Sequence, residues 1–436
     1  MNDYLKTDNG SPINRRDFMK AAALAGIPLG LTSCAGRKDY KHLPLPAAND
    51  PDFWHKLRTQ FPMPPDEAYC NTGTLGAPPT RVLNSMIEHM TKHAVEIAHC
   101  DWSDGGINLL SGYFPYIDLR SKIGKLINAD YKNIALTQNA TMGMNYLANG
   151  LDLPEGAEVI TTDREHPGGI KGWLVQAKRR GIVLREVPIP VPAEKPQQII
   201  DIFEKAIRPE TRLITFSQIT SVTGTILPAK ELCQLAASKG LFSIVDGAQA
   251  IGHIPVDVQD IGCDAYFASP HKWLLAPAGS GILYICKEKI DSVWTTLASS
   301  QWDNHKDNGY RLTQSGTGNP AILVGFEAAI DFHFEIGPER IYNRIKSLGD
   351  YLRDGLTKIP RTRILTSLHP EMNSGMTTFN VAQMDGKALQ DELWNRAKLQ
   401  PRSQGKKGIR YCTHIYNSFT EIDKALAIVA DLAKRA

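Results

Sequence analysis

A regular alternation between residues 120 and 286 constrains the fold of this chain more than any other feature. Short apolar segments rich in β-branched residues alternate there with longer amphipathic segments, each of which ends near a glycine. The short segments predict strands at 133–137, 158–162, 183–188, 213–217, 242–245 and 281–286. The longer segments predict helices at 141–150, 168–180, 199–207 and 229–239. This alternation indicates an α/β fold, in which helices cover both faces of a mostly parallel sheet.

The pattern changes after residue 330, where long helical segments at 337–357 and 420–436 enclose short apolar runs. We expect a large domain at 51–330 and a smaller α+β domain at 331–436, with residues 51–70 packing on the smaller one. A chain of 436 residues is long enough to form both.

Composition excludes several other classes of protein. Hydrophobic residues make up 42% of the chain and charged residues 22%, which does not fit a disordered, collagen-like or coiled-coil protein. The 49 Lys and Arg residues are nearly balanced by 46 Asp and Glu, so no basic excess indicates a nucleic acid as partner. Seven cysteines without a CxxC pair indicate neither a disulfide framework nor a zinc ribbon.

The N-terminus has the order of a secretion signal. Residues 14–20 read NRRDFMK and precede the run AAALAGIPLGLTSC, which is too short to span a membrane. These residues resemble a twin-arginine export signal, and residues 31–34 (LTSC) resemble a lipoprotein processing site. The resemblance implies a signal peptide at 1–33, a lipid on Cys34 and a tether at 34–50. It therefore implies contact with the export machinery and an exported, periplasmic or extracytoplasmic protein that is anchored to a membrane.

Two residues of the segment 242–284 carry the chemistry of a candidate site. A predicted strand brings Asp246 to the carboxyl edge of the sheet, where ligands of such folds bind, and Lys272 lies in a turn before the next strand. A lysine with a lowered pKa can form a Schiff base, and an aspartate beside it can hold a pyridinium N–H. Taken alone, the pair also fits a surface lysine and a helix cap.

The sequence segments DGAQAIGHIPVDV, SPHKW and PAGSGILY resemble the cofactor region of the class V aminotransferase family. This family includes cysteine desulfurases and isopenicillin N epimerase-like enzymes. The resemblance extends over most of residues 65–430. It implies the fold type I of pyridoxal phosphate (PLP) enzymes, with PLP as cofactor and an amino acid as substrate. It implies Lys272 as the imine lysine, Asp246 as partner of the pyridine nitrogen and Gln249 near the phenolic oxygen. Ser269 and His271 match phosphate-binding positions.

Further segments match positions of the family that contact the cofactor. Ala140 and Thr141 open a predicted helix, whose backbone N–H groups would bind the phosphate. His166, in TTDREHPGG, matches the family histidine that stacks on the pyridine ring. Ser221 replaces a family asparagine in SQITSVTGT, which leaves its contact with the cofactor open. Thr317, in GTGN, matches a threonine that reaches the partner's cofactor and implies a homodimer, although a glycine turn within one chain is the alternative.

Substrate recognition is expected partly from the C-terminal domain. Arg402 aligns with the family arginine that binds the substrate α-carboxylate, and Arg410 is the competing assignment. Asn71 and Thr74, in YCNTGTLGAPP, line the substrate side or form a turn.

Several alternatives are disfavoured. No cysteine lies between residues 366 and 402, where desulfurases carry their nucleophile, and Cys412 falls in a predicted strand. A GxxxxGK[ST] loop and a GxGxxG fingerprint are both missing from the sequence, and His89 and His93 on a predicted helix have no third metal ligand.

The sequence thus predicts a PLP enzyme in which Lys272 takes the α-proton of an amino acid. An epimerase, an aminotransferase and a β-eliminating lyase share this first step and stay open. A lipoprotein that binds PLP without turnover is the alternative from another class.

Overall fold

The computed structural model describes residues 44–99 and 114–435. The expected signal peptide at 1–33 and Cys34 lie outside the described residues. The described helices include none that is both long and apolar enough to cross a membrane.

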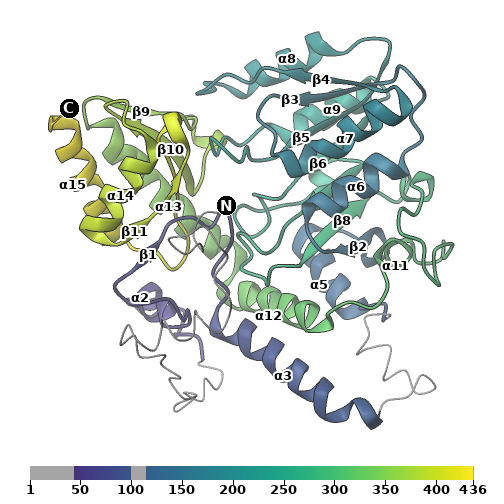
Figure 1. Ribbon diagram of the computed structural model, residues 1–436, viewed down its shortest axis with the longest axis horizontal. Coiled ribbons are helices and arrows are strands. Elements are labelled where there is room, and N and C mark those ends of the chain that lie inside the picture. Colours follow the sequence, from purple (N-terminus) through teal and green to yellow (C-terminus); the bar gives the residue numbers. More distant parts are fainter. Residues whose placement is uncertain (1–43, 100–113, 436) are drawn as a thin grey trace, which may run out of the picture. The chain divides into compact units, whose positions relative to one another are not determined.

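A seven-stranded sheet forms the centre of the larger part of the molecule (Figure 1). Its strand order is β2-β8-β7-β6-β5-β3-β4. Strands β7, β6, β5, β3 and β4 are parallel to one another, whereas β8 is antiparallel to both of its neighbours. The bounds are β2 (Ile134–Thr137), β3 (Glu158–Thr162), β4 (Val183–Val187), β5 (Thr211–Ser217), β6 (Phe242–Asp246), β7 (Ala265–Ala268) and β8 (Gly281–Ile285). The predicted α/β fold with a mostly parallel sheet is confirmed.

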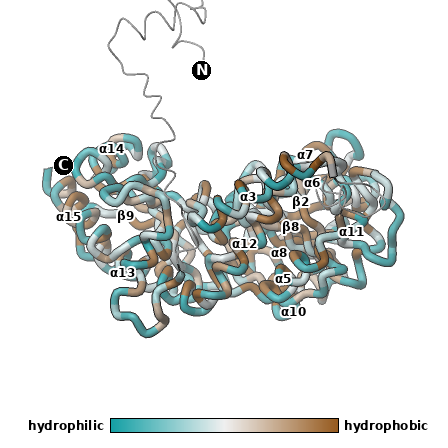
Figure 2. The backbone as a smooth tube through the Cα atoms, turned by 90° about the horizontal axis from the view of Figure 1, so that it is seen from below, coloured by the Kyte–Doolittle hydropathy of each residue, from teal (hydrophilic) through white to brown (hydrophobic). Residues whose placement is uncertain are grey.

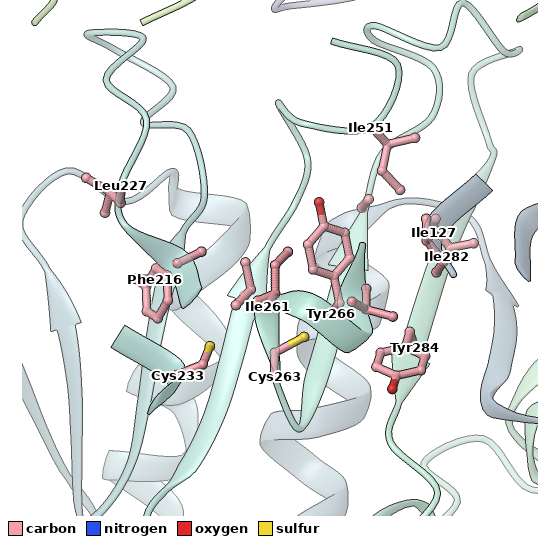
Figure 3. Close-up of a cluster of buried hydrophobic side chains, with 14 of the residues drawn as sticks. Ile127, Phe216, Leu227, Cys233, Ile251, Ile261, Cys263, Tyr266, Ile282 and Tyr284 are labelled. Atoms are coloured by element: carbon pink, nitrogen blue, oxygen red, sulfur yellow. The ribbon is translucent and has the colours of Figure 1, made fainter. Parts of the chain in front are cut away.

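Helices cover both faces of this sheet, and each face has its own apolar core. Helices α6 (Ala140–Gly150) and α7 (Pro167–Arg180) pack on one face. The other face carries α5 (Ile117–Ile127), α8 (Pro196–Ala206), α9 (Ala229–Ser238), α10 (Val258–Ile261) and α12 (Pro320–Ile336). Side chains from β5, β7, β8, α5 and α9 meet in this second core (Figure 3). Burial of apolar side chains on both faces explains why these strands read as continuous hydrophobic runs.

Hydrophobic stretches run along the strands and the inner sides of the helices, whereas the outer turns are hydrophilic (Figure 2). Further helical elements include α2 (Phe53–Arg58), α3 (Thr80–Glu96), α11 (Asn308–Thr313) and the 3-10 turn η2 (Tyr131–Asn133). Helix α3 packs along α12, and its residues His89 and His93 belong to no group of metal ligands among the described residues.

A second, antiparallel sheet lies in the C-terminal part, with the order β12-β13-β10-β9. Its strands are β9 (Thr362–Ile364), β10 (Met376–Val381), β12 (Arg402–Ser403) and β13 (Ile409–Cys412). Helices α13 (Pro338–Thr357), α14 (Gly386–Ala397) and α15 (Phe419–Arg435) enclose a third core with it. The boundary expected between residues 330 and 331 falls inside α12, so that helix is continuous across it.

The segment at 51–70 contacts the C-terminal part. Strand β1 (Ala68–Tyr69) pairs in parallel with β11 (Leu399–Gln400). Phe53, Leu57 and Phe61 share an apolar cluster with residues of β10 and β13.

Most predicted elements match the structure within one to three residues. Strand β7 was not predicted, because its four residues, AYFA, form too short an apolar run to be separated from the turns around it. The antiparallel direction of β8 was not predicted either, because hydrophobic pattern carries no information on strand direction.

Candidate active site

A pocket of about 290 Å³ opens at the carboxyl ends of β5, β6 and β7, where the topology predicts a ligand. The structure brings nearly all of the predicted site residues together there. The lining includes Thr74, Ala140, Thr141, His166, Ser221, Asp246, Gln249, Ser269, His271, Lys272, Arg402 and Arg410. Asn71 does not line it, and Thr317 lies elsewhere.

Asp246 ends β6 and forms part of the pocket floor. Its side chain is buried, and Oδ1 accepts a hydrogen bond of 2.8 Å from the backbone N–H of Ala248. A Cβ atom on Gly169 would lie 2.6 Å from Oδ2, so glycine at this position keeps the space next to that oxygen open. Burial raises the pKa of Asp246, while Ala248 and Lys272 oppose the rise. One carboxylate oxygen is thus fixed by the backbone and the other is available to a ligand.

Lys272 follows β7 in the turn Ser-Pro-His-Lys. Burial lowers the pKa of Lys272 to about 8, with a smaller contribution from Arg410 and Arg402, while Asp246 opposes the shift. Near neutral pH a much larger fraction of this amine is therefore unprotonated than of an ordinary lysine, and the unprotonated form can act as nucleophile or base.

An aromatic column includes Trp273, the residue that follows Lys272. Trp273 stacks on His253 with ring centroids 3.6 Å apart, and His414 and Tyr416 continue the column on the C-terminal side. His253 Nε2 accepts a bond from the N–H of Gly375, and the other end of the ring donates to the carbonyl of Gln249. Burial lowers the pKa of His253 and of His414 to about 3, so both rings are neutral.

The phosphate-binding end is built around the first turn of α6. Asn139 caps this helix by accepting from the N–H of Met142, and the N–H of Ala140 donates to Ser269 Oγ. Thr141, the next residue of this turn, also lines the pocket. The positive end of a helix and its unpaired N–H groups form an anion site.

His271 also lines the pocket at this end. Its Nδ1 is buried and has no hydrogen-bond partner among the described residues, and burial lowers its pKa to about 4. An unpartnered buried ring nitrogen is costly unless a ligand satisfies it. The pocket therefore offers hydroxyl, amide and imidazole groups for the phosphate and a carboxylate for the pyridine nitrogen, so the expected cofactor fits the residues present.

His166 is the N-cap of α7, and its Nδ1 accepts from the N–H of Gly168 at 3.0 Å. The proton of the neutral ring therefore resides on Nε2. Burial lowers the pKa of His166, and Lys272 and the two arginines lower it further. A neutral imidazole at the pocket wall is suited to lie against an aromatic ring.

Gln249 is buried between two neighbours. Its Nε2 donates to the carbonyl of Gly73 at 2.8 Å, and its Oε1 accepts from Trp273 Nε1 at 2.7 Å. Each amide hydrogen needs its own acceptor, so one hydrogen of this group stays available toward the pocket. Ser221 presents its backbone to the site, since its carbonyl accepts from Arg410.

The two candidate arginines lie opposite each other on β12 and β13 but have different surroundings. Arg410 is 1% exposed and donates to the carbonyl of Ser221, to Asn71 Oδ1 and to Thr74 Oγ1. Arg402 is exposed, and its side chain makes one bond of 3.2 Å, to Thr74 Oγ1. Asn71 and Thr74 thus hold arginines, a role that their turn-like sequence did not indicate.

Thr317 is exposed in the loop before α12 and does not line the pocket of its own chain. Asn319 of the same motif caps α12, so part of the motif serves the local turn.

Sequence reasoning missed Glu165 and Gly169. Glu165 accepts from the N–H of Ser217 at 3.1 Å and contacts the hydroxyls of Ser217 and Thr162. Burial raises its pKa to about 7, with a smaller contribution from Asp246. The signal for Gly169 was the pair of glycines after His166 and Pro167, because glycine is a poor residue for the first turn of a helix without another reason.

The family described as aminotransferase class-V matches residues 79–426. The isopenicillin N epimerase of Streptomyces clavuligerus is 30% identical over 391 residues, which cover 85% of this chain and 96% of the relative. A probable cysteine desulfurase of Synechocystis sp. is 30% identical over 332 residues, which cover 71% of this chain and 78% of the relative.

A solved structure of a C-DES mutant, with glycine covalently linked to its PLP cofactor, superposes with a TM-score of 0.76 at 27% identity. The superposed region covers 86% of this chain and 99% of the C-DES chain. The predicted fold type I and the predicted cofactor are confirmed by these relationships. The chain belongs to the aminotransferase class-V family, and its cofactor is pyridoxal phosphate.

Proposed function

We propose that this protein is a PLP-dependent epimerase, which inverts the configuration at the α-carbon of an amino acid. The observation that carries the proposal is the match to an isopenicillin N epimerase over 96% of that enzyme's length. The pocket supports it, because no cysteine is among the described residues that line it, and desulfurases that use a persulfide need one.

We assign different roles to the residues of the pocket. Arg402 binds the substrate carboxylate, since its guanidinium is exposed beside the pocket and its fork geometry matches two carboxylate oxygens. Arg410 positions the loops that carry Asn71, Thr74 and Ser221. When bound, PLP supplies a sink for the electron pair that remains after loss of the α-proton.

Lys272 moves the proton. Its amine, with a pKa of about 8, is the pocket's basic group beside the carboxylate of Asp246. Its Nζ accepts the α-proton of the bound amino acid. Return of a proton to the same carbon from the opposite face gives the mirror-image amino acid, whereas its delivery elsewhere gives a keto acid.

Aminotransfer is the second candidate, since the family that matches residues 79–426 is described by that activity. One experiment separates the two. The full chain with PLP is incubated in deuterated water with single L- and D-amino acids and no keto acid. Exchange of the α-proton together with the opposite enantiomer supports the epimerase.

Other outcomes of that experiment are equally informative. A stoichiometric keto acid with conversion of the cofactor to its amine form replaces the proposal by an aminotransferase. Loss of the substrate side chain replaces it by a lyase. Absence of any α-proton exchange, with PLP bound, contradicts all three.

We also propose a homodimer in which Thr317 reaches the partner's cofactor. Its exposure on a loop outside its own pocket supports this, as do the exposed indoles of Trp294 and Trp302, which are 61% and 49% exposed. Sedimentation analysis of the full chain tests it, and a monomer that turns over substrate would contradict it.

Export by the twin-arginine route with a lipid on Cys34 is proposed from the order of residues 14–34. Fractionation of a bacterial host compares the parent with R15K/R16K and C34A. Accumulation of the first variant in the cytoplasm and release of the second from the membrane are expected. An unchanged distribution of both would contradict the proposal.

A further inference from the structure

A wide cleft of about 1360 Å³ lies between the loops after β3 and β5 and the C-terminal sheet. Its lining carries five cationic side chains: Arg164, Arg361, Arg363, Lys406 and Lys407. Asp385 is the single acidic residue among the described residues that line it. The cleft thus concentrates more positive charge than the net charge of the entire chain, which is +3.

Most of these cations have no partner within the described part of the chain. Arg164 pairs with Asp163 at 3.0 Å and donates to the carbonyl of Ile189. The side chains of Arg361, Arg363, Lys406 and Lys407 form no ion pair or hydrogen bond with other described residues, and all four are exposed. Asp385 forms no ion pair with the described residues, and its Oδ1 accepts from the N–H of Lys387 at the start of α14. Clustered like charges without counter-charges repel one another, and an anion would relieve this.

The backbone that presents these cations is fixed. Arg361 directly precedes β9 with a φ of +62°, and Arg363 is the second residue of that strand. Lys406 and Lys407 lie in a tight turn that ends at Gly408, whose φ is +89°. A Cβ atom on Gly408 would lie 2.1 Å from the carbonyl oxygen of Phe379. This glycine therefore packs the turn against β10 and keeps both lysines at the cleft.

The cleft adjoins the pocket that contains Lys272. Three chain segments each contribute to both cavities: Arg164 with His166, Thr223 with Ser221, and Lys406 with Arg402. The first two pairs are separated by two residues, which is at most about 7 Å of backbone. A ligand with its amino acid end in the pocket would therefore reach the cleft with an extended side chain of moderate length.

We propose that the cleft binds the distal anionic group of the substrate, which is an amino acid whose long side chain ends in a carboxylate or a phosphate. The inference rests on the proposed function, because it places the α-amino and α-carboxylate groups beside Lys272 and Arg402. Guanidinium and ammonium groups recognise both kinds of anion, and the two sources are separated by the choice of substrates.

Three substrates of equal chain length test the proposal in the full chain loaded with PLP. They are L-2-aminosuberate, its phosphonate counterpart L-2-amino-7-phosphonoheptanoate, and the neutral L-2-aminooctanoate. KM and kcat are measured from α-proton exchange. We expect KM for at least one anionic substrate to be about tenfold below that of the neutral one, as two or more partly exposed ion pairs would give. The anion with the lower KM identifies the terminal group, and added salt should reduce the preference.

Two double variants locate the effect. K406Q/K407Q and R361Q/R363Q should each raise KM for the preferred anionic substrate about threefold to tenfold, with kcat changed less. The matched control K239Q removes an exposed lysine that directly follows α9 and does not line the cleft, and it should leave the preference intact.

Equal KM values for all three substrates in the parent protein would overturn the cleft assignment while the proposed function stands. A preference for an anion that survives in both double variants would also overturn it. Failure of every substrate, short neutral amino acids included, to exchange the α-proton would instead contradict the proposed function.

Discussion

The pocket and the basic cleft share loops but use cationic side chains in opposite ways. In the pocket, Arg410 is buried and donates to three oxygen atoms of the protein. In the cleft, Arg361, Arg363 and both lysines are exposed and donate to no described residue. A buried cation needs protein partners to offset its desolvation, whereas an exposed cation keeps its water and can exchange it for a ligand. We therefore expect changes in the pocket to alter folding or chemistry strongly, and changes in the cleft to alter affinity alone.

The largest effect is expected from Lys272→Ala. Loss of the proton-moving amine should lower the rate of α-proton exchange by about a thousandfold or more. Borohydride treatment followed by mass spectrometry should find the cofactor attached to the peptide with residue 272 in the parent and not in the variant. Lys239→Ala is the control. A variant that still exchanges the α-proton at the parent rate would refute the assignment of Lys272.

The next largest effect is expected from Arg410→Gln, which should lower the stability of the fold. Removing this guanidinium leaves the buried carbonyl of Ser221 without its donor. Asn71 and Thr74 also lose a donor, although Thr74 still donates to Asn71 and accepts from Arg402. The free energy of unfolding in urea should fall by about 2–4 kcal/mol. Arg402→Gln should change it by less than about 1 kcal/mol and raise KM instead. Equal destabilisation by both variants would erase the distinction between a positioning and a substrate-binding arginine.

Glu165→Gln tests a buried acid that stabilises the pocket in its protonated form. The pKa of Glu165 is about 7 in the folded protein, compared with an ordinary value of 4.5, so the folded chain holds a proton between these values that the unfolded chain releases. The free energy of unfolding of the parent therefore loses this contribution as pH rises from 4.5 to 7.

Relative to the parent, Glu165→Gln should accordingly gain stability between pH 5 and pH 8. Urea unfolding at several pH values measures this difference. A difference that does not depend on pH would show that the carboxyl is ionised throughout this range.

The smallest effect on stability is expected in the cleft. K406Q/K407Q removes two exposed charges that bind no described residue, so the free energy of unfolding should change by less than about 0.5 kcal/mol. Thermal and urea unfolding measure it. A loss of several kcal/mol would mean that these lysines serve the fold, and the contrast with the pocket would disappear.

Sequence alone was sufficient where function and fold depend on local pattern. The buried strands β3, β5 and β6 read as apolar runs because both of their faces are covered, and they end at the loops that carry His166, Ser221 and Asp246. The same topology rule placed Lys272 near Asp246, and the pocket contains both.

Sequence was insufficient where residues meet through long-range pairing. Arg410 is buried and Arg402 is exposed although the two lie opposite each other on paired strands, a difference that neither local pattern shows. The basic cleft combines residues 164, 361–363 and 406–407, and no short segment of the chain contains enough of them to indicate a site.

The aromatic column that contains Trp273 limits how the two sheets can move relative to each other. Trp273 lies between His253 and His414, whose Nε2 donates to the carbonyl of Trp273, and Gly375 of the C-terminal part donates to His253. A hinge motion between the two sheets would have to part Trp273 from the tilted ring of His414 and break both bonds among buried side chains. We therefore expect the two sheets to move as one stiff frame, in which loop movement rather than closure of one part on the other admits the substrate.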